Sequence, residues 1–378
     1  MKRLRHPLLS PSLGTQRELV SLHYGDADAG EKAYLQASLH ADELPGMLVM
    51  HHLMRLLDDA EARGRMRGEV VLVPLANPIG LSQHILHATH GRFELASGEN
   101  FNRVYPDFLA ALGDEIEARL GRDEHANRRT IRDAMRQHLA TLAPATELAS
   151  LRRALSALAC DADVVLDLHC DNEAVLHLYC EEPYWPLCEP LARLLGARTV
   201  LLGKASGGAS FDEAMSGIWW QLDVRLRERS VPIPLACLSV TVELRGEADV
   251  DHALAAHDAA ALYAFLVRRG IVASAHGDER AAPLPELCCA PTPLAGSETL
   301  RAPHPGVIVF VKQPGDEVEA GEVVAEIIDP LERRVTPVLA TYPGLLYARV
   351  HKRYATRDMA IAKVAGAVAF RSGNLLSP

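Results

Sequence analysis

The sequence predicts an α/β protein in which a mixed central sheet is flanked by helices and followed by a C-terminal all-β domain. Two observations carry this prediction. Five short segments rich in β-branched residues alternate with helical patterns over about the first 270 residues. From about residue 300 onward, short apolar runs instead alternate with turn residues and form an imperfect repeat.

Length and composition favour a globular chain of two domains. The chain has 378 residues, of which 48% are hydrophobic and 23% charged. Its formal charge is -10 and no basic stripe stands out, so nucleic acid is not expected as a partner. No apolar run reaches the roughly 18 residues of a membrane span, so a cytoplasmic protein without a membrane partner is expected. The seven cysteines include no C-x-x-C pair, which favours reduced thiols.

The expected strands of the sheet are KAYLQASL (32–39), GEVVLVPLAN (68–77), ADVVLDLH (162–169), ARTVLLG (197–203) and LACLSVTVEL (235–244). Between the first two, Val49, Leu53, Leu56 and Leu57 follow the spacing of one buried helical stripe. This spacing predicts a crossover helix from Pro45 to about residue 59.

The boundaries of the domains follow from changes of pattern. Residues 107–159 are charged and helix-prone without a strand signal, which predicts a helical insertion with solvated charged faces. Residues 281–299 contain many Pro, Ala and Ser residues and carry neither helical nor strand periodicity. The expected division is therefore an α/β domain at 1–280, a linker at 281–299 and a β domain at 300–378.

The expected β domain contains two related halves, which begin at Pro305 and Pro343. The pattern predicts a small barrel or sandwich built from two β units. It resembles biotinyl/lipoyl-type domains, which carry their cofactor on a lysine at the tip that joins the halves. The corresponding tip here, DPLERR (329–334), has no lysine, so a swinging arm is not expected.

His40 and Glu43 follow directly after the first expected strand, where open α/β sheets place their active sites. An imidazole and a carboxylate three residues apart suit zinc, which accepts nitrogen and oxygen ligands. A second H-x-x-E, formed by His276 and Glu279, lies after a helix with no strand before it. Its context argues against a metal site there.

His169 ends another expected strand and is the candidate for the third zinc ligand, with Asp167 and Asp171 available to orient its ring. A structural, hydrogen-bonded histidine is the alternative. Glu243 lies near the end of an apolar strand, where burial would raise its pKa and suit a general base. The alternative for Glu243 is a capping role or a salt bridge with Arg245.

The polar, turn-rich segment 91–108 supplies three more candidates. Arg103, next to Asn102, could bind a carboxylate with its guanidinium fork, and Arg92 could stabilise an oxyanion. Surface positions are the alternative for these residues. The histidines at 84, 87 and 90 lack a carboxylate or thiolate partner and are interpreted as a polar loop, and residues 206–213 as a capping box that opens a helix.

The order H-x-x-E, N-R, H and E at successive strand ends resembles the zinc carboxypeptidase superfamily, and most closely its succinylglutamate desuccinylase/aspartoacylase branch. Ala41 stands where that family usually has glycine, and Arg245 interrupts its Glu-Leu-Gly run. The resemblance implies a set of zinc ligands, a pair for the substrate carboxylate, a carbonyl-polarising arginine and a general base and acid. These are, respectively, His40, Glu43 and His169; Asn102 and Arg103; Arg92; and Glu243.

The expected function is hydrolysis of the amide bond of a small N-acylated amino acid, with one zinc ion per chain. Two alternatives stay open, a metallocarboxypeptidase acting on peptides and a non-catalytic binding protein that retains the fold. The acyl group, the amino acid, a possible homo-oligomer and a role for a C-terminal tyrosine such as Tyr342 are not fixed by the sequence.

Overall fold

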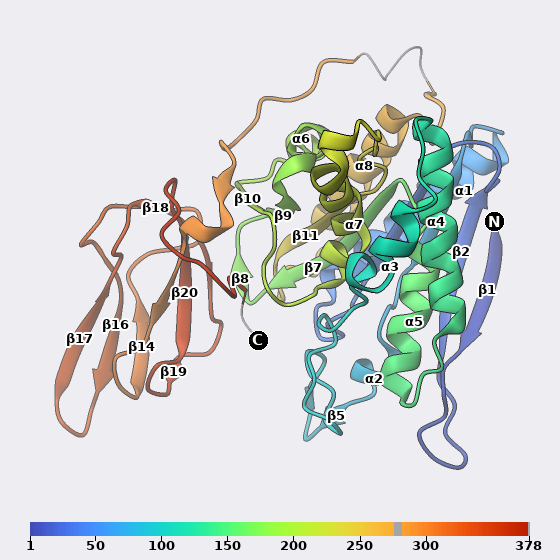
Figure 1. The fold of residues 1–378 in the computed structure, drawn as a ribbon. Coiled ribbons are helices and arrows are strands. Elements are labelled where there is room, and N and C mark those ends of the chain that lie inside the picture. The colour runs from blue at the N-terminus through green and yellow to red at the C-terminus, as the bar shows by residue number, and fades with distance from the viewer. Residues whose placement is uncertain (276–281, 377–378) are drawn as a thin grey trace.

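The computed structural model describes residues 1–275 and 282–376. A large N-terminal part is joined by an extended connection to a smaller set of strands, the C-terminal unit (residues 297–365) (Figure 1). The second H-x-x-E, at His276 and Glu279, lies outside the described residues. No helix of the described residues is long and apolar enough to cross a membrane.

A nine-stranded mixed sheet forms the centre of the N-terminal part. In spatial order its strands are β1 (Lys2–Pro7), β2 (Glu18–Gly25), β4 (Glu69–Val73), β3 (Lys32–Ala37), β7 (Val164–Asp171), β11 (Leu238–Gly246), β9 (His177–Glu181), β10 (Thr199–Gly203) and β12 (Thr292–Pro293). The four strands β4, β3, β7 and β11 are mutually parallel. The five predicted strands are confirmed as β3, β4, β7, β10 and β11. Strands β1, β2, β9 and β12 were not predicted.

Helices cover both faces of this sheet (Figure 1). One apolar core lies beneath α1 (Pro45–Ala62), α6 (Trp185–Leu195) and α8 (His252–Arg269). The other lies beneath α3 (Phe108–Glu117), α4 (Glu124–Thr141), α5 (Glu147–Ala159) and α7 (Phe211–Leu226). Alternation along β7 serves both, because Leu166 and Leu168 face the first core while Val165 faces the second. The predicted crossover helix is confirmed as α1.

The helices predicted within residues 107–159 are present as α3, α4 and α5. The expectation that their charges are solvated was wrong for Arg152, which is only 9% exposed. Its guanidinium donates to Glu99 Oε2 at 2.7 Å and to the carbonyl oxygen of Asn100 at 2.9 Å. The helices therefore also support the polar segment that reaches the site.

The C-terminal unit consists of two β sheets around a shared apolar core. One sheet has the order β13 (Ser297–Arg301), β20 (Ala360–Ala365), β18 (Gly344–Arg349) and β15 (Glu317–Val318). The other has the order β17 (Arg334–Leu339), β16 (Val323–Asp329), β14 (Gly306–Phe310) and β19 (Tyr354–Ala355). These sheets support the predicted all-β character of this region.

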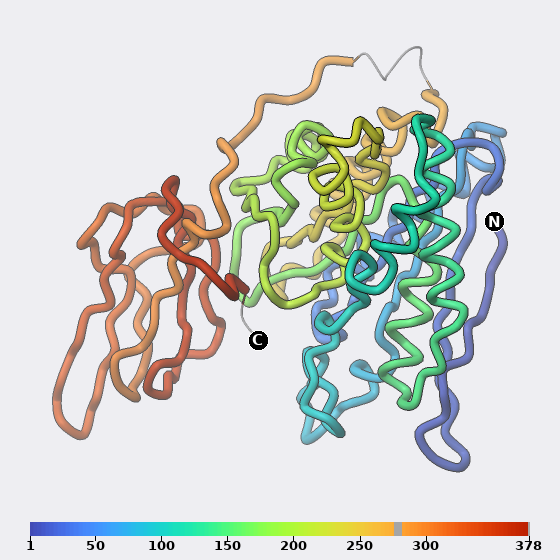
Figure 2. The backbone as a smooth tube through the Cα atoms, viewed as in Figure 1, coloured from blue at the N-terminus to red at the C-terminus, as the bar shows by residue number. Residues whose placement is uncertain are grey.

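The two parts of the molecule share backbone pairing. Strand β8 (Glu173–Ala174), which follows β7, pairs with β18 of the C-terminal unit, so that Ala174 lies opposite Ala348. The end of the chain also returns to the N-terminal part, where the Leu375 amide donates to the Ser206 carbonyl at 2.9 Å (Figure 2). The C-terminal unit is therefore held directly against the carboxyl-terminal end of β7.

Candidate active site

The loop between β3 and α1 carries the first two predicted ligands. After β3 ends, Ser38 adopts a left-handed backbone with φ of 57°, which turns the chain away from the strand. The Ser38 hydroxyl donates to the Glu43 carbonyl at 3.0 Å and closes the loop before α1 begins at Pro45. His40 and Glu43 are both buried as a result, at 4% and 6% exposure.

The third predicted ligand reaches the same point from the neighbouring strand β7. Nδ1 of His40 lies 2.9 Å from Glu43 Oε1, and Nδ1 of His169 lies 2.7 Å from Glu43 Oε2. The ligand atoms of the three residues all lie within 4.8 Å of one another. Among the described residues this is the single group of three or more such side chains that could hold a metal ion.

The hydrogen bonds around the two imidazoles fit a cation between them and Glu43. Nε2 of His40 lies 2.9 Å from Asn100 Oδ1, and Nε2 of His169 lies 2.9 Å from Asp167 Oδ2. Both partner atoms are oxygens, which favours a proton on each Nε2 and leaves each Nδ1 available to a metal ion. When both rings are neutral, two lone pairs and a carboxylate face one another, an arrangement that a bound cation stabilises. Two imidazole nitrogens and one carboxylate match the ligand set of a catalytic zinc site.

The pKa values of His40, Glu43 and His169 are shifted by burial and by the charged groups around them. Burial opposes ionisation of Glu43, but His40 and His169 hold its pKa well below the usual value. Burial and the nearby Arg92 lower the pKa of His40. Burial alone would also lower the pKa of His169, but Asp167 and Glu43 raise it above the ordinary histidine value. A metal ion binds the neutral imidazole, so it would displace a proton from His169.

Glu243 lies beside the cluster on β11, where it is paired in register with His169 of β7. Its Oε2 is buried and has no hydrogen-bond partner among the described residues. Burial, with the nearby Glu43 carboxylate, raises the pKa of Glu243 to about 8. The salt bridge with Arg245 that the sequence left open is not formed. A left-handed backbone at Arg245, with φ of 67°, accompanies a pairing of its guanidinium with Asp258 of α8.

Arg92 lies beside the cluster because the backbone that precedes it runs very close to the loop that carries His40. Its guanidinium lies 3.3 Å from His40 Nδ1 and 3.7 Å from Glu43 Oε1. The preceding residue, Gly91, lies so close to the His40 loop that a Cβ there would meet the Asp42 amide nitrogen at 2.1 Å. Only glycine allows this approach without moving the backbone.

Asn102 and Arg103 are neighbours in the chain but contact different residues. Asn102 Oδ1 accepts a hydrogen bond from the Phe211 amide at 2.8 Å, and its Nδ2 lies 3.5 Å from His169 Nε2. Arg103 lies across Gly208, whose missing Cβ would meet the Arg103 Nε at 2.7 Å. The loop before α7 therefore supports both residues.

All seven predicted site residues line one cavity of about 270 Å³. Part of its wall comes from the C-terminal unit, through β18, β20 and the residues between them. Two further residues of the site were not predicted: Asn100, which contacts His40 Nε2, and Lys363, which lines the cavity. Asn100 lies in the turn-rich segment just before Asn102, where nothing marks its role, and Lys363 lies far along the chain in a region assigned to a separate domain.

The other residues that the sequence singled out have no catalytic arrangement around them. The described histidines of the 84–90 loop belong to a small exposed hairpin of β5 (His84–Ile85) and β6 (Ala88–Thr89). Tyr342 stacks on Phe370 with ring centroids 4.1 Å apart and is not among the residues that line the cavity. Ser210 occupies the position before α7, but its hydroxyl donates to Asp212 instead of capping a backbone amide.

Solved structures similar to this chain share the fold over almost the whole length. A succinylglutamate desuccinylase/aspartoacylase family protein from Shewanella amazonensis has a TM-score of 0.83 and 24% identity, covering 97% of this chain and 98% of its own. A similarly described protein from Shewanella frigidimarina has a TM-score of 0.81 and 23% identity, covering 97% of each chain. The product-bound ectoine utilization protein EutE (DoeB) from Ruegeria pomeroyi has a TM-score of 0.65 and 16% identity, covering 96% of this chain and 93% of its own.

A search of curated proteins found no match. The family model of the succinylglutamate desuccinylase/aspartoacylase catalytic domain matches residues 29–269, which include the His40 loop, the 91–108 segment and the ends of β7 and β11. The chain therefore belongs to the succinylglutamate desuccinylase/aspartoacylase family.

Proposed function

We propose that this protein is a zinc-dependent amidohydrolase that removes the acyl group from a small N-acylated amino acid. The observation that carries the proposal is the convergence of His40, Glu43 and His169 beside the buried carboxylate of Glu243. Membership of a deacylase family supports the same reaction class.

The chemistry divides between the metal and the side chains around it. When bound, zinc supplies a Lewis acid that lowers the pKa of a water molecule and polarises the amide carbonyl. Glu243 accepts the proton of the attacking water and then donates it to the leaving nitrogen, a role that suits a desolvated carboxylate with a raised pKa. Arg92 donates to the developing oxyanion from its position beside His40 and Glu43.

Arg103 holds the carboxylate of the amino acid, and Asn102 completes this end of the cavity. The guanidinium fork matches a carboxylate in a bidentate manner, which fixes the amide relative to the water. The C-terminal unit covers the cavity, whose volume of about 270 Å³ favours a small molecule over an extended peptide.

The decisive test is Glu243→Gln. The amide cannot accept a proton, so kcat should fall by about 10²–10⁴-fold. Zinc content, measured by elemental analysis, should stay near one ion per chain because the three ligands are untouched. A panel of N-acyl amino acids and short peptides identifies the substrate class first.

The matched control is Glu247→Gln, which changes another carboxylate of the same cavity and should keep at least about a tenth of the activity. Full turnover in Glu243→Gln, or hydrolysis of peptides in preference to N-acyl amino acids, would contradict the proposal.

A further inference from the structure

The wall that the C-terminal unit contributes to the cavity contains few functional groups. Strands β18 and β20 and the turn between them present mainly small apolar side chains, including Ala348, Ala360 and Ala362. The basic side chains on this wall are Arg349 and Lys363. What these two cations bind therefore decides which chemical groups the wall can accept.

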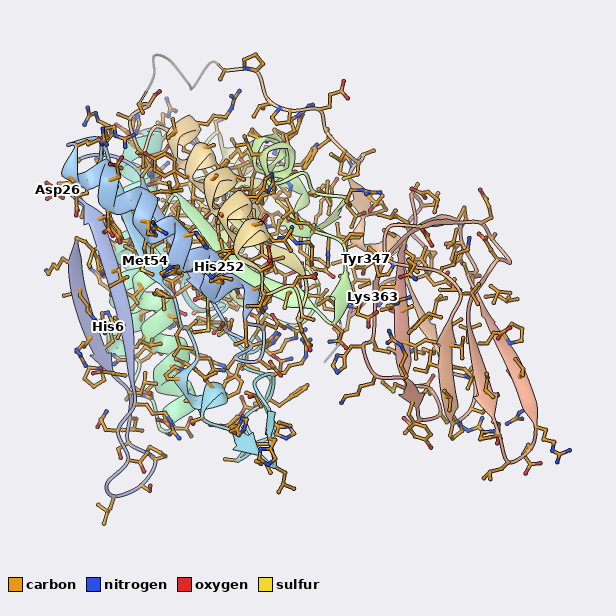
Figure 3. All side chains as sticks on the ribbon, turned by 180° about the vertical axis from the view of Figure 1, so that it is seen from behind. His6, Asp26, Met54, His252, Tyr347 and Lys363 are labelled. Atoms are coloured by element: carbon orange, nitrogen blue, oxygen red, sulfur yellow. The ribbon has the colours of Figure 1, made fainter. Side chains whose placement is uncertain are left out.

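Lys363 is paired across the junction between the two parts. Its Nζ donates to Asp171 Oδ2 at 2.6 Å, although the two residues are 192 positions apart. Figure 3 shows Lys363 and Tyr347 on the side of the C-terminal unit that faces the N-terminal part. The Asp171 carboxylate follows His169 by two positions on β7, so this ion pair lies next to the proposed reaction centre.

Arg349 is also fully engaged. Its Nε donates to Glu173 Oε2 at 2.6 Å, and its two terminal nitrogens donate to the Lys312 carbonyl at 2.8 Å and to Gln313 Oε1 at 3.2 Å. The guanidinium also lies over the ring of Phe310, 4.8 Å from its centroid. Both cations of the wall are thus neutralised by acids of the N-terminal part.

Further carboxyl groups line the same cavity. Asp42, Glu243 and Glu247 all contribute to its lining, in addition to Asp171. A second carboxylate carried by the acyl group would lose its hydration beside these acids, and both cations of this wall are already paired with other acids. An uncharged acyl group would contact alanine side chains, with no charge to desolvate and no need of a cation.

We propose that the acyl group of the substrate is uncharged, such as acetyl, and that the Asp171–Lys363 ion pair determines this specificity. The inference rests on the proposed deacylase function. It selects among N-acyl amino acids those whose acyl part has no carboxylate, and it excludes dicarboxylic acyl groups such as succinyl.

The first test compares N-acetyl, N-succinyl and N-succinamoyl derivatives of the same amino acids, with aspartate, glutamate and ornithine as the panel. The succinamoyl group has the size of succinyl but no charge. We expect kcat/KM for the acetyl and succinamoyl compounds to exceed that for the succinyl compound at least tenfold. Succinyl turnover equal to or faster than acetyl turnover, or succinamoyl turnover as slow as succinyl turnover, would overturn the inference.

Binding separates this inference from the proposed function. If the zinc-loaded protein hydrolyses none of the compounds, the deacylase proposal fails. Calorimetric titration with the same compounds then still tests whether this wall of the cavity rejects a carboxylate. Binding of the succinyl compound at least tenfold weaker than the succinamoyl compound supports a wall that rejects carboxylates. Equal or tighter binding of the succinyl compound overturns it.

Two variants test the ion pair directly. Asp171→Asn removes the acid and leaves the Lys363 ammonium available, so the ratio of succinyl to acetyl kcat/KM should rise at least tenfold. Asp358→Asn, which removes an exposed carboxylate of the same unit, is the matched control and should leave the ratio unchanged. If Asp171→Asn does not fold, Glu173→Gln removes the acid paired with Arg349, and the ratio should rise in the same direction. An unchanged ratio in the folded variant overturns the assignment.

Discussion

Asn100 shows how a single neutral side chain can orient a histidine that could bind a metal ion. Its Oδ1 accepts from the Asn102 amide at 2.8 Å, which fixes the oxygen toward His40 Nε2. The Nδ2 of Asn100 has no partner among the described residues. The side chain therefore acts through its oxygen alone, and that oxygen directs the His40 lone pair toward Glu43.

Asn100→Ala is expected to weaken zinc affinity about 10–100-fold, because the His40 ring loses the acceptor that fixes its tautomer. Competition with a chelator measures the affinity. Asn100→Asp keeps the oxygen and should restore most of the binding. Equal affinities in the wild type and Asn100→Ala would show that the contact does not orient the ring.

Gly208→Ala tests the placement of Arg103. The added Cβ would lie 2.7 Å from Arg103 Nε, so the flexible arginine must shift while the backbone stays in place. We expect KM for the substrate to rise about tenfold or more, with an unchanged melting temperature. Gly121→Ala is the control, because a Cβ there meets nothing within 4 Å. An unchanged KM would remove Arg103 from the substrate site.

The convergence of His40, Glu43 and His169 could be predicted because each lies at or just after the end of an apolar strand that is visible in the sequence. His40 and His169 are two such cases, and their parallel strands are neighbours in the sheet. Asn100 lies in a segment without periodicity, and Lys363 reaches the cavity only through packing between distant parts of the chain. Side chains of these two kinds leave no local pattern from which a site can be predicted.

At the scale of elements, the strands that were missed are those with weak local signals. Strands β1 and β2 form an antiparallel edge, and β1 has mostly exposed side chains, so it lacks an apolar run. Strand β9 has five residues and was not distinguished from the loop after β7. Its burial depends on β10 and β11 on either side, which a local window does not contain.

Strand β9 nevertheless carries a buried carboxylate with a consequence for stability. Glu181 is 5% exposed, and its Oε1 accepts from the Trp220 indole of α7 at 2.6 Å. Burial raises its pKa from 4.5 to about 8. Below pH 4.5 the group is protonated in both the folded and unfolded states. Between pH 4.5 and 8 it ionises first in the unfolded state, so its contribution to stability falls as the pH rises.

Glu181→Gln should therefore stabilise the protein relative to the wild type at pH 8 but not at pH 4.5. The difference in unfolding free energy should grow by at most about 1.4 kcal/mol per pH unit within this window. Denaturant titration at several pH values measures it. Glu182→Gln, at a more exposed neighbouring position, is the control. A difference that does not change with pH would refute the buried, protonated state of Glu181.

At the scale of the whole molecule, charged contacts reinforce the pairing of β8 with β18. Glu173 accepts hydrogen bonds from both Arg349 and Arg353 at 2.6 Å, and Asp171 binds Lys363 close by. The division into separate domains stays a prediction, but this junction couples the two parts. The sequence did not predict it, because β8 has only two residues.

We expect the zinc-loaded protein to unfold in one calorimetric transition, because the two parts share a sheet and these ion pairs. The double variant Asp171→Asn/Glu173→Gln should separate the transition into two, with the C-terminal unit melting first. Two transitions in the wild type would show that the parts are energetically independent. Asp358→Asn, away from the junction, should keep a single transition.

The pairing of β8 with β18 also limits how a substrate can enter. A hinge motion that swung the C-terminal unit away would have to break backbone hydrogen bonds together with the Glu173 and Asp171 ion pairs. We therefore expect the C-terminal unit to stay in place when a substrate binds, so that the volume enclosed between the two parts limits the size of the molecule that fits.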